Sequence, residues 1–359
     1  MSSKIIVACG GTGGHSFPGL AVAKDLASRG HYVVVWSSGR SIENTVMKYW
    51  RGPMFSTGAR PLSLKNAFSN FLSILRCRRE MRREHPDALL AMGSYSSLPP
   101  VLAAAACHVP VVLHEANTVP GRAVEYLSRY AKTIATSFDV TKDYLPQRNV
   151  VKTGLPVRHE IAGQPRLPDA PEDAFTVFIT GGSQGAHRVN EIASAAVILV
   201  QADLAKRGFP RRLHVIHQTG ADDEQDIIRL YATKGIDARV HAFEREMGRA
   251  FATADVVVAR AGASTCFELA LVGKPAFFIP LPSALRNHQH FNAEAFVKAD
   301  AAFEARQESL TPRALANWIL HKIDHPEALK ALAGGMRAMA TPDAAANVAN
   351  IVLNHATGG

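Results

Sequence analysis

The stretch VACGGTGGHSFPGLAVA, residues 7–23, decides how the first half of the chain folds. It follows a short β-rich run, places four glycines around Thr12, and leads into a helical pattern expected from Pro18 to Ser28. Glycine permits positive φ angles and close approach to the backbone, and a helix start offers unpaired N–H groups to an anion. The stretch therefore predicts a strand, a tight turn and a helix. The turn either receives an anion, usually phosphate, or binds nothing.

The same pattern returns in FTVFITGGSQGAH, residues 175–187, after a proline-rich segment typical of a linker. Strand-length apolar runs alternate with helical segments on both sides of that linker, which predicts parallel sheets covered on both faces. We therefore expect an α/β fold of two doubly wound domains with a ligand cleft between them. The expected bounds are 1–157, joined by the C-terminal helix of 341–359, and 158–340; the helix itself is expected at 342–355, where the pattern allows packing on either half.

Composition narrows the class of protein. The 359 residues are 47% hydrophobic and 20% charged, as in an ordinary globular protein, and the four cysteines form no disulfide or zinc pattern. We expect neither a signal peptide nor a membrane-spanning helix. The net charge of +9 calls for an anionic partner: nucleic acid, anionic lipid or a phosphorylated small molecule.

Two common nucleotide sites fit poorly. A dinucleotide fingerprint read from Gly11 has Ser16 where the third glycine belongs. The next strand ends in Ser37 and Ser38, where an NAD site carries an acidic residue for the ribose. Neither glycine turn ends in the Gly-Lys-Ser/Thr of a Walker A loop. The pair His114–Glu115 does not open a zinc HExxH motif, because Thr118 stands where the second histidine is needed.

Six motifs in one order carry a resemblance that spans nearly the whole chain. They are GGTGGHSFPGLAVA, HEAN at 114–117, GLPVR at 154–158, GGSQGA at 181–186, RAGAST at 260–265 and NHQ at 287–289. This set resembles the MurG family of bacterial transferases, which complete the lipid-linked precursor of peptidoglycan. The resemblance implies a GT-B fold of two Rossmann-like domains. It also implies inverting transfer of GlcNAc from UDP-GlcNAc to the C4 hydroxyl of MurNAc in undecaprenyl-pyrophosphoryl-MurNAc-pentapeptide (lipid I), giving lipid II.

The resemblance also implies site residues. His15 is the candidate catalytic base; the alternative is that it only caps or hydrogen-bonds the helix start. Ser183 contacts the donor phosphates or serves as an N-cap, and Glu268 holds the ribose hydroxyls or completes a capping box with Thr265. Arg158 is a donor-site residue or a solvated linker residue. The full set of expected substrate-binding residues is Thr12, Gly13, Gly14, Asn117, Arg158, Ser183, Gln184, Ala263, Ser264, Thr265, Glu268 and Gln289.

Three departures from the family pattern affect this expectation. Ala116 stands where the family usually has Gln, Ser94 where a second glycine is common, and Arg286 where relatives often carry Asp. The change at Ala116 affects local hydrogen bonding, and Ser94 lies in the loop expected to face the acceptor pyrophosphate. The change at Arg286 affects the contacts expected with the sugar. None of them removes a residue assigned to the chemistry. No metal and no cofactor are expected.

Residues 61–83 combine an apolar helical stripe with a basic run, in which RCRREMRR holds five arginines and one glutamate. The stripe either faces the protein core or lies on a membrane, and a lipid-linked acceptor favours the membrane. The expected membrane-associated residues are Phe68, Phe71, Leu72, Leu75, Arg76, Arg78 and Arg79. We expect a peripheral protein at the cytoplasmic face of the bacterial inner membrane, with other cell-wall synthesis proteins as further partners.

Other functions remain open from sequence alone. A related GT-B enzyme would use another lipid acceptor, and a nucleotide-sugar sensor would bind UDP-GlcNAc without turnover. Nucleic-acid binding is not expected, because the basic run contains no interleaved aromatic residue.

Overall fold

The computed structural model describes residues 2–11, 13–40, 43, 47–210 and 212–357. The chain divides into two compact units: unit 1 comprises residues 1–158 and 341–359, and unit 2 comprises residues 159–340. Arg158 therefore groups with unit 1, one residue beyond the boundary expected from sequence. Within the described residues, no helix is long and apolar enough to cross a membrane.

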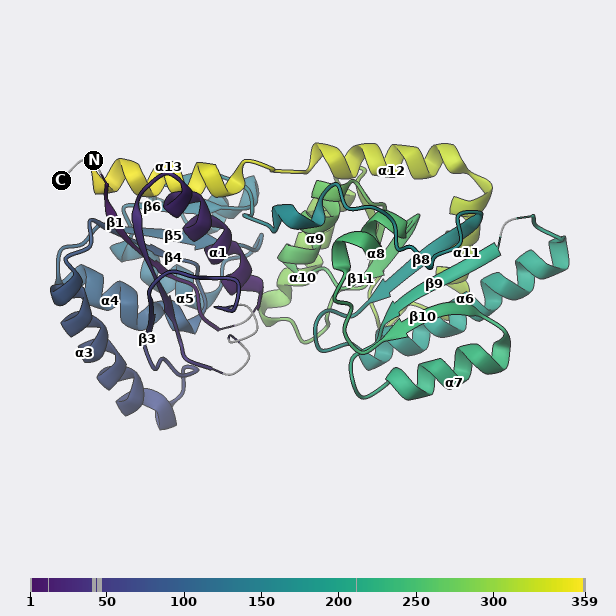
Figure 1. Ribbon diagram of the computed structural model, residues 1–359, viewed down its shortest axis with the longest axis horizontal. Helices are drawn as coiled ribbons and strands as arrows, with labels where there is room; N and C mark the ends of the chain where they lie inside the picture. The colour runs from purple at the N-terminus through teal and green to yellow at the C-terminus, as the bar shows by residue number, and fades with distance from the viewer. Residues whose placement is uncertain (1, 12, 41–42, 44–46, 211, 358–359) are drawn as a thin grey trace. The chain divides into compact units, whose positions relative to one another are not determined.

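Unit 1 is built on a parallel sheet, which has seven strands in its described part, in the order β3-β2-β1-β4-β5-β6-β7 (Figure 1). The strands are β1 (Lys4–Ala8), β2 (Tyr32–Ser37), β3 (Met54–Ser56), β4 (Ala88–Ala91), β5 (Val111–Glu115), β6 (Thr133–Thr136) and β7 (Val150–Lys152). The helices are α1 (Gly13–Ser28), α3 (Ala67–Glu84), α4 (Leu98–Ala106), α5 (Arg122–Leu127) and α13 (Ala344–Ala356).

Alternate residues of β1 serve the two faces of this sheet. Ile5 and Val7 belong to a core that includes α1 and α13, whereas Ile6 and Ala8 belong to a core that includes α3, α4 and α5. Burial on both faces is what makes the strands read as continuous apolar runs. Figure 1 shows α13, the last helix of the chain, beside α1.

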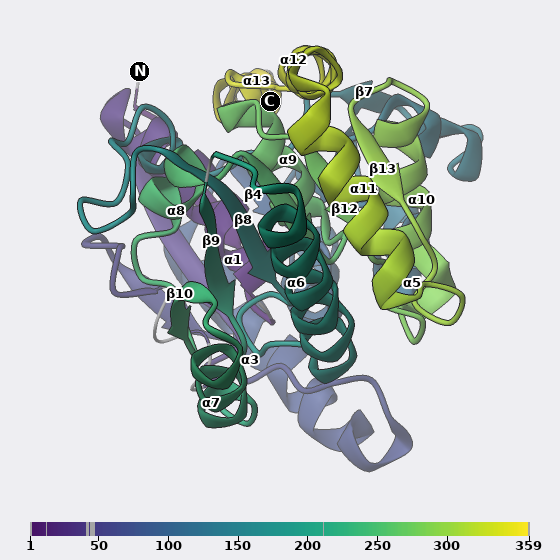
Figure 2. The ribbon, with the colours of Figure 1, turned by 90° about the vertical axis from the view of Figure 1, so that its right-hand side faces the viewer.

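Unit 2 repeats the plan, with six strands in its described part, in the order β10-β9-β8-β11-β12-β13. Its strands are β8 (Ala174–Thr180), β9 (Arg212–Gln218), β10 (Asp237–His241), β11 (Val256–Ala259), β12 (Ala276–Phe278) and β13 (Ala302–Glu304). Its helices are α6 (His187–Arg207), α7 (Glu224–Lys234), α8 (Met247–Thr253), α9 (Ala263–Val272), α10 (His288–Val297), α11 (Pro312–Asp324) and α12 (Pro326–Ala338). Figure 2 shows α6 and α11 side by side.

The expected α/β class with parallel sheets is confirmed, and all pairings between the described strands are parallel. One helix boundary was wrong: α1 begins at Gly13, five residues before Pro18. Proline loses the hydrogen bond that its own N–H would donate one turn back, and its ring crowds that carbonyl, so a helix continues through it only at a cost. As a result, His15 lies inside the first turn of α1.

Packing between α1 and α13 gives a stability prediction. Leu26 on α1 is fully buried in the core that includes α13. Leu26→Ala is expected to lower the free energy of unfolding by about 2–5 kcal/mol, because it removes buried methyl groups and leaves a cavity. Urea unfolding of the purified chain measures this. Leu64→Ala is the matched control, since Leu64 is 97% exposed, and its effect is expected to stay within about 0.5 kcal/mol.

Candidate functional site

The predicted site residues of unit 1 lie after the carboxyl ends of neighbouring strands. His15 follows β1, Asn117 follows β5, and β4 lies between these two strands in the sheet. The sheet order reverses direction between β1 and β4, and that crossover is where open α/β sheets bind ligands. Thr12 lies outside the described residues.

His15 sits close to the loop after β4. A Cβ atom added to Gly93 would lie 3.7 Å from His15 Cδ2. Because α1 begins at Gly13, His15 is the third residue of the helix and cannot be its N-cap. His15 is therefore not the cap residue of α1, and its role as a base stays a prediction. The half-buried imidazole is placed on the first helical turn, beside the β4 loop.

His114 lies beneath this region, fully buried on β5. Its Nε2 atom lies 3.2 Å from Gly154 O and must donate, since a carbonyl only accepts. Burial, as the largest cause, lowers the pKa of His114 to about 4, and a smaller contribution comes from His15. His114 is therefore neutral at physiological pH, and its hydrogen bond to Gly154 O links β5 to the segment after β7.

Glu115 organises the loop that carries Asn117. Its Oε1 atom accepts hydrogen bonds from the Asn117 backbone N–H at 2.8 Å and from Asn117 Nδ2 at 3.2 Å, and its Oε2 accepts from Gly121 N–H at 2.9 Å. Burial raises the pKa of Glu115, and these hydrogen bonds oppose that rise. The carboxylate thus holds the loop together around Ala116.

Arg158 is not a solvated linker residue. Its guanidinium carbon lies 4.6 Å from the ring centroid of Phe17, on α1 two residues after His15. A planar cation stacks favourably on an aromatic face, which restrains Arg158 near the start of the helix. The structure thus brings Arg158 and the His15 turn into one neighbourhood of unit 1.

Unit 2 gathers its predicted residues at the carboxyl ends of β8, β11 and β12. The turn after β8 exposes Ser183 and Gln184, α9 begins directly after β11, and Gln289 is the second residue of α10. β8 and β11 are neighbours at the point where this sheet reverses direction. The predicted residues that follow these strands are Ser183, Gln184, Ala263, Ser264, Thr265, Glu268 and Gln289.

Two capping alternatives in unit 2 were wrong. Helix α6 begins at His187 with Ala186 as its N-cap residue, so Ser183 lies in the preceding turn. Helix α9 begins at Ala263 after Gly262, so Thr265 is the third residue of the helix and no capping box with Glu268 forms. Glu268 is 8% exposed. Gln289 Oε1 accepts a hydrogen bond from the Leu281 backbone N–H at 3.0 Å.

Close backbone packing fixes the second glycine turn, Gly181–Gly185. A Cβ atom added to Gly185, which has φ of 75°, would lie 2.0 Å from Thr219 O. Asn190 on α6 donates to that same carbonyl at 2.8 Å and to Asp223 Oδ2 at 2.6 Å. The turn after β8 and the loop after β9 are therefore joined into one rigid edge.

A buried histidine supports this edge from below. His217 Nε2 lies 3.2 Å from Asn190 Oδ1 and donates to it, because the Asn190 amide nitrogen is already donating elsewhere. His217 Nδ1 then accepts from the Tyr231 hydroxyl at 2.9 Å. Burial lowers the pKa of His217 to about 3, so the imidazole is neutral.

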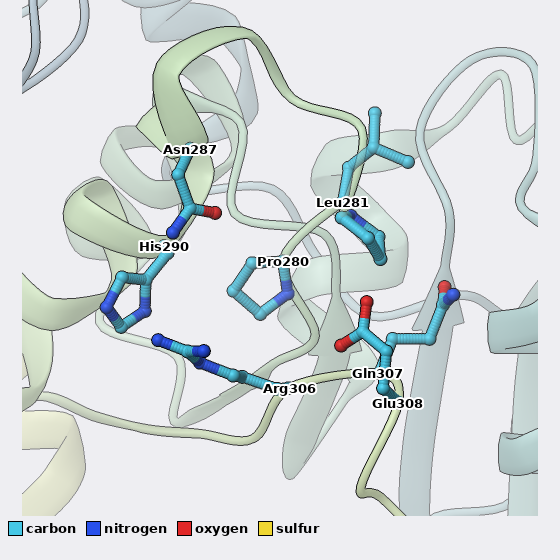
Figure 3. Close-up of a pocket in the computed structure, with 8 residues that line it drawn as sticks. Pro280, Leu281, Asn287, His290, Arg306, Gln307 and Glu308 are labelled. Carbon is cyan, nitrogen blue, oxygen red and sulfur yellow. The ribbon is translucent and has the colours of Figure 1, made fainter.

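A pocket of about 290 Å³ lies near the predicted site residue Gln289, but sequence reasoning assigned no site role to the residues that line it (Figure 3). Arg260 fixes its walls: the guanidinium donates to Ile279 O and Pro280 O at 3.0 Å and to Gln307 Oε1 at 2.7 Å. Figure 3 shows the Arg306 guanidinium pointing toward His290, with Glu308 on the opposite side. The pocket lining comprises Pro280, Leu281, Pro282, Asn287, His290, Arg306, Gln307 and Glu308. The polar side chains among them, such as Asn287, Arg306 and Glu308, could donate and accept hydrogen bonds with a small polar ligand.

Among the described residues, no three His, Cys, Asp or Glu side chains are arranged so that they could hold a metal ion. Sequence reasoning also missed Glu43, whose carboxylate accepts a hydrogen bond from Gly11 N–H. Gly10 and Gly11 follow β1 and are called the first glycine turn below. No motif surrounds Glu43 in the sequence.

Comparison with known proteins defines the class first. The model of the glycosyltransferase family 28 N-terminal domain matches residues 5–136, and that of the family 28 C-terminal domain matches residues 176–348. The chain has the corresponding two parallel-sheet units of a GT-B glycosyltransferase. An epimerase acting on UDP-N-acetylglucosamine, 13% identical with a TM-score of 0.71, shares the fold alone.

Full-length relatives then define the family. A protein of Geobacter metallireducens is 35% identical over 95% of this chain and 96% of its own length, and one of Stutzerimonas stutzeri is 35% identical over the whole of both chains. Both are named UDP-N-acetylglucosamine–N-acetylmuramyl-(pentapeptide) pyrophosphoryl-undecaprenol N-acetylglucosamine transferase. The crystal structure of Acinetobacter baumannii MurG is 30% identical, with a TM-score of 0.78, covering 99% of this chain and 100% of that one. The chain belongs to the MurG family, which confirms the resemblance drawn from the six motifs.

The buried His217 gives a pH prediction. Its folded pKa lies below the ordinary value near 6.5, so between about pH 3 and 6.5 the unfolded chain binds a proton that the folded chain does not. The free energy of unfolding therefore falls as pH drops through this window, and His217→Gln is expected to reduce that slope by about 1.4 kcal/mol per pH unit. Urea unfolding at pH 4.5, 5.5 and 6.5 measures the slope. An unchanged slope in the variant would contradict the assignment of a neutral buried imidazole.

Proposed function

We propose that this chain is an inverting N-acetylglucosaminyltransferase that moves GlcNAc from UDP-GlcNAc to the C4 hydroxyl of MurNAc in lipid I, giving lipid II for peptidoglycan synthesis. The observation that carries this function is membership of the MurG family over nearly the whole chain. Inversion requires in-line attack by the acceptor hydroxyl on the anomeric carbon, a base that removes the hydroxyl proton, and stabilisation of departing UDP.

His15 is proposed as the base. Its position on the first turn of α1 favours the neutral imidazole, because the positive end of the helix dipole disfavours a second positive charge. A neutral imidazole is the form that accepts a proton. Gly13 and Gly14 place backbone N–H groups of the same helical turn beside it, and Asn117 and Arg158 of unit 1 complete the proposed substrate contacts.

The second glycine turn is proposed to receive the UDP diphosphate. Ser183 and Gln184 are exposed there, directly before the N–H groups at the start of α6. Glu268 is proposed to accept hydrogen bonds from both ribose hydroxyls, and Gln289 to bind the GlcNAc hydroxyls. Ala263, Ser264 and Thr265 form the first turn of α9 between these groups. Departing UDP would then be stabilised by oriented N–H groups and hydroxyls.

The apolar stripe on α3 supports association with an anionic membrane surface. Phe68 is 72% exposed and Phe71 is 54% exposed, and Leu72 and Leu75 are also exposed. The alternative of a core-facing stripe was wrong, since α3 instead buries Asn70, Ser73, Cys77 and Met81. An apolar patch of this kind on a chain that handles a lipid-linked substrate fits insertion into the headgroup region.

Basic side chains accompany the stripe. Arg79 is exposed, Arg76 lies with its guanidinium carbon 5.1 Å from the Phe55 ring centroid, and Arg78 is partly buried. Each arginine near an anionic leaflet adds about 1 kcal/mol of attraction. We place this surface at the cytoplasmic face of the inner membrane, with other cell-wall synthesis proteins as further partners.

The catalytic prediction concerns His15. His15→Ala is expected to lower kcat for lipid I-dependent UDP release by about 10²–10⁴-fold, because no base then accepts the proton, while the Kd for UDP-GlcNAc stays within about twofold. Enzyme-coupled detection of UDP measures turnover, and calorimetry measures binding. His321→Ala, an exposed position on α11, is the matched control with unchanged kcat. Wild-type UDP release that does not depend on lipid I would overturn the proposed function.

The membrane prediction concerns the exposed stripe. The double variant Phe68→Asp and Phe71→Asp is expected to abolish cosedimentation with vesicles containing phosphatidylglycerol and to leave the Kd for UDP-GlcNAc unchanged. Ile228→Asp, at a 38% exposed position on α7, is the control that should still sediment. Equal sedimentation of the wild type and the double variant would exclude α3 as the membrane surface.

A further inference from the structure

The first glycine turn, which follows β1, is filled by a side chain of the protein itself. Glu43 is 2% exposed, and its Oε1 accepts a hydrogen bond from Gly11 N–H at 2.6 Å. Its Oε2 accepts from Ser38 N–H at 2.9 Å and from Gly39 N–H at 3.0 Å. The Ser38 hydroxyl also donates to the carboxylate. One carboxylate thus joins the loops that follow the adjacent strands β1 and β2.

The turn around this carboxylate has almost no room to rearrange. A Cβ atom added to Gly10 would lie 2.6 Å from Ser38 N and 3.0 Å from Glu43 Oε1. Gly11 has φ of 110°, and a Cβ added there would lie 2.6 Å from Ser94 Oγ. On the other side, the Ser96 hydroxyl donates to Gly10 O at 2.7 Å. The loops after β2 and β4 therefore pack against the turn from both sides, and the Glu43 side chain adds a hydrogen bond to it.

The second glycine turn is closed differently. There, Gly182 N–H donates to Thr180 Oγ1 at 3.1 Å and Gly185 N–H donates to Gly182 O at 2.9 Å. Both acceptors are neutral. A phosphate placed at the turn in unit 1 would meet the buried Glu43 carboxylate, and like charges at close range repel. The two turns look alike in sequence, but a turn N–H donates to a carboxylate in unit 1 and to neutral oxygens in unit 2.

We propose that Glu43 is a positioning residue for the transfer reaction: as a built-in anion it occupies the first glycine turn and fixes the start of α1, and with it His15. This inference rests on the proposed role of His15 as the base. It assigns the two turns different tasks, because the diphosphate of a nucleotide sugar is received by the turn in unit 2 and the turn in unit 1 holds a proton acceptor in place.

The charge state of the neighbourhood agrees with this assignment. Burial, and secondly the negative charge of Glu43, raise the pKa of the Cys9 thiol to about 12. Cys9 directly precedes the turn, and its carbonyl accepts a hydrogen bond from the Ser16 hydroxyl at 2.9 Å. A neutral thiol adds no negative charge beside the Glu43 carboxylate.

Glu43→Gln tests the proposal, because the amide keeps the size of the side chain but turns an N–H₂ group toward backbone donors. We expect kcat for lipid I-dependent UDP release to fall about tenfold or more, since small misplacements of a base are costly. The Kd and KM for UDP-GlcNAc are expected to stay within about twofold. Amide hydrogen exchange, followed by mass spectrometry, is expected to quicken in the peptide that covers residues 8–20.

Asp87→Asn is the matched control. The Asp87 carboxylate also accepts a backbone hydrogen bond, from Lys4 N–H at 2.7 Å, but at the opposite end of β1. This variant is expected to keep wild-type kcat and wild-type exchange in residues 8–20. If Glu43→Gln does not fold, Ser38→Ala removes only the hydroxyl donor to Glu43, and we expect it to lower kcat about threefold with unchanged Kd.

The outcomes separate the inference from the function it rests on. A Glu43→Gln enzyme with kcat within about twofold of the wild type, or with unchanged exchange in residues 8–20, overturns the positioning role while wild-type turnover upholds the proposed function. A fall in kcat matched by an equal loss of UDP-GlcNAc affinity also overturns it, because that pattern marks general loss of structure. Wild-type protein without lipid I-dependent UDP release overturns the proposed function, and the positioning role falls with it.

Discussion

Close backbone approach where a strand turns into a helix is the constraint on which both units depend. At Gly185 the carbonyl of Thr219 lies where any side chain would have to stand. Two backbone segments can approach this closely only where Cβ is absent. The positions of the site residues that follow the turn depend on this contact. The helix starts, their N–H groups and the residues on their first turns are placed by these turns rather than by the helices themselves.

Each unit then stabilises its turn from the neighbouring strand. In unit 2 hydrogen bonds run from Tyr231 through His217 to Asn190, which donates to the Thr219 carbonyl and the Asp223 carboxylate after β9. In unit 1 the Glu43 carboxylate joins the loops after β1 and β2, by accepting from Gly11 N–H and Ser38 N–H. Duplicate architecture therefore does not mean duplicate chemistry, because the unit 1 turn donates to a buried carboxylate, whereas the unit 2 turn donates to a threonine hydroxyl and a carbonyl.

Sequence patterns predicted the parallel sheets and both glycine turns, because strands buried on two faces and strand–glycine–helix junctions leave periodic, local marks. They missed β3, β7 and β13, which have three residues each and no usable period. They also misplaced the start of α1, where Pro18 imitates a first helical position. Glu43 escaped notice because its partners Gly11 and Ser38 become neighbours only through the sheet register.

Helix α3 shows the limit of periodicity most clearly. Its apolar stripe reads equally well as a core face or a membrane face, since both bury apolar side chains at the same spacing. The structure resolves this by burying Asn70 and Cys77 on the opposite side, with Asn70 Oδ1 accepting from Arg60 N–H at 2.9 Å. A polar face can be the inner one when its side chains find backbone partners, and sequence alone does not reveal those partners.

The packing of α13 sets an order of events during synthesis. The core of unit 1 that contains Leu20 and Val22 also contains Val348 and Val352, which leave the ribosome more than three hundred residues later. Until then, the residues of α1 and of the sheet that α13 contacts lack that helix, although all seven strands of the described sheet have already emerged. Unit 1 can therefore complete this core only after the whole of unit 2 has been synthesised.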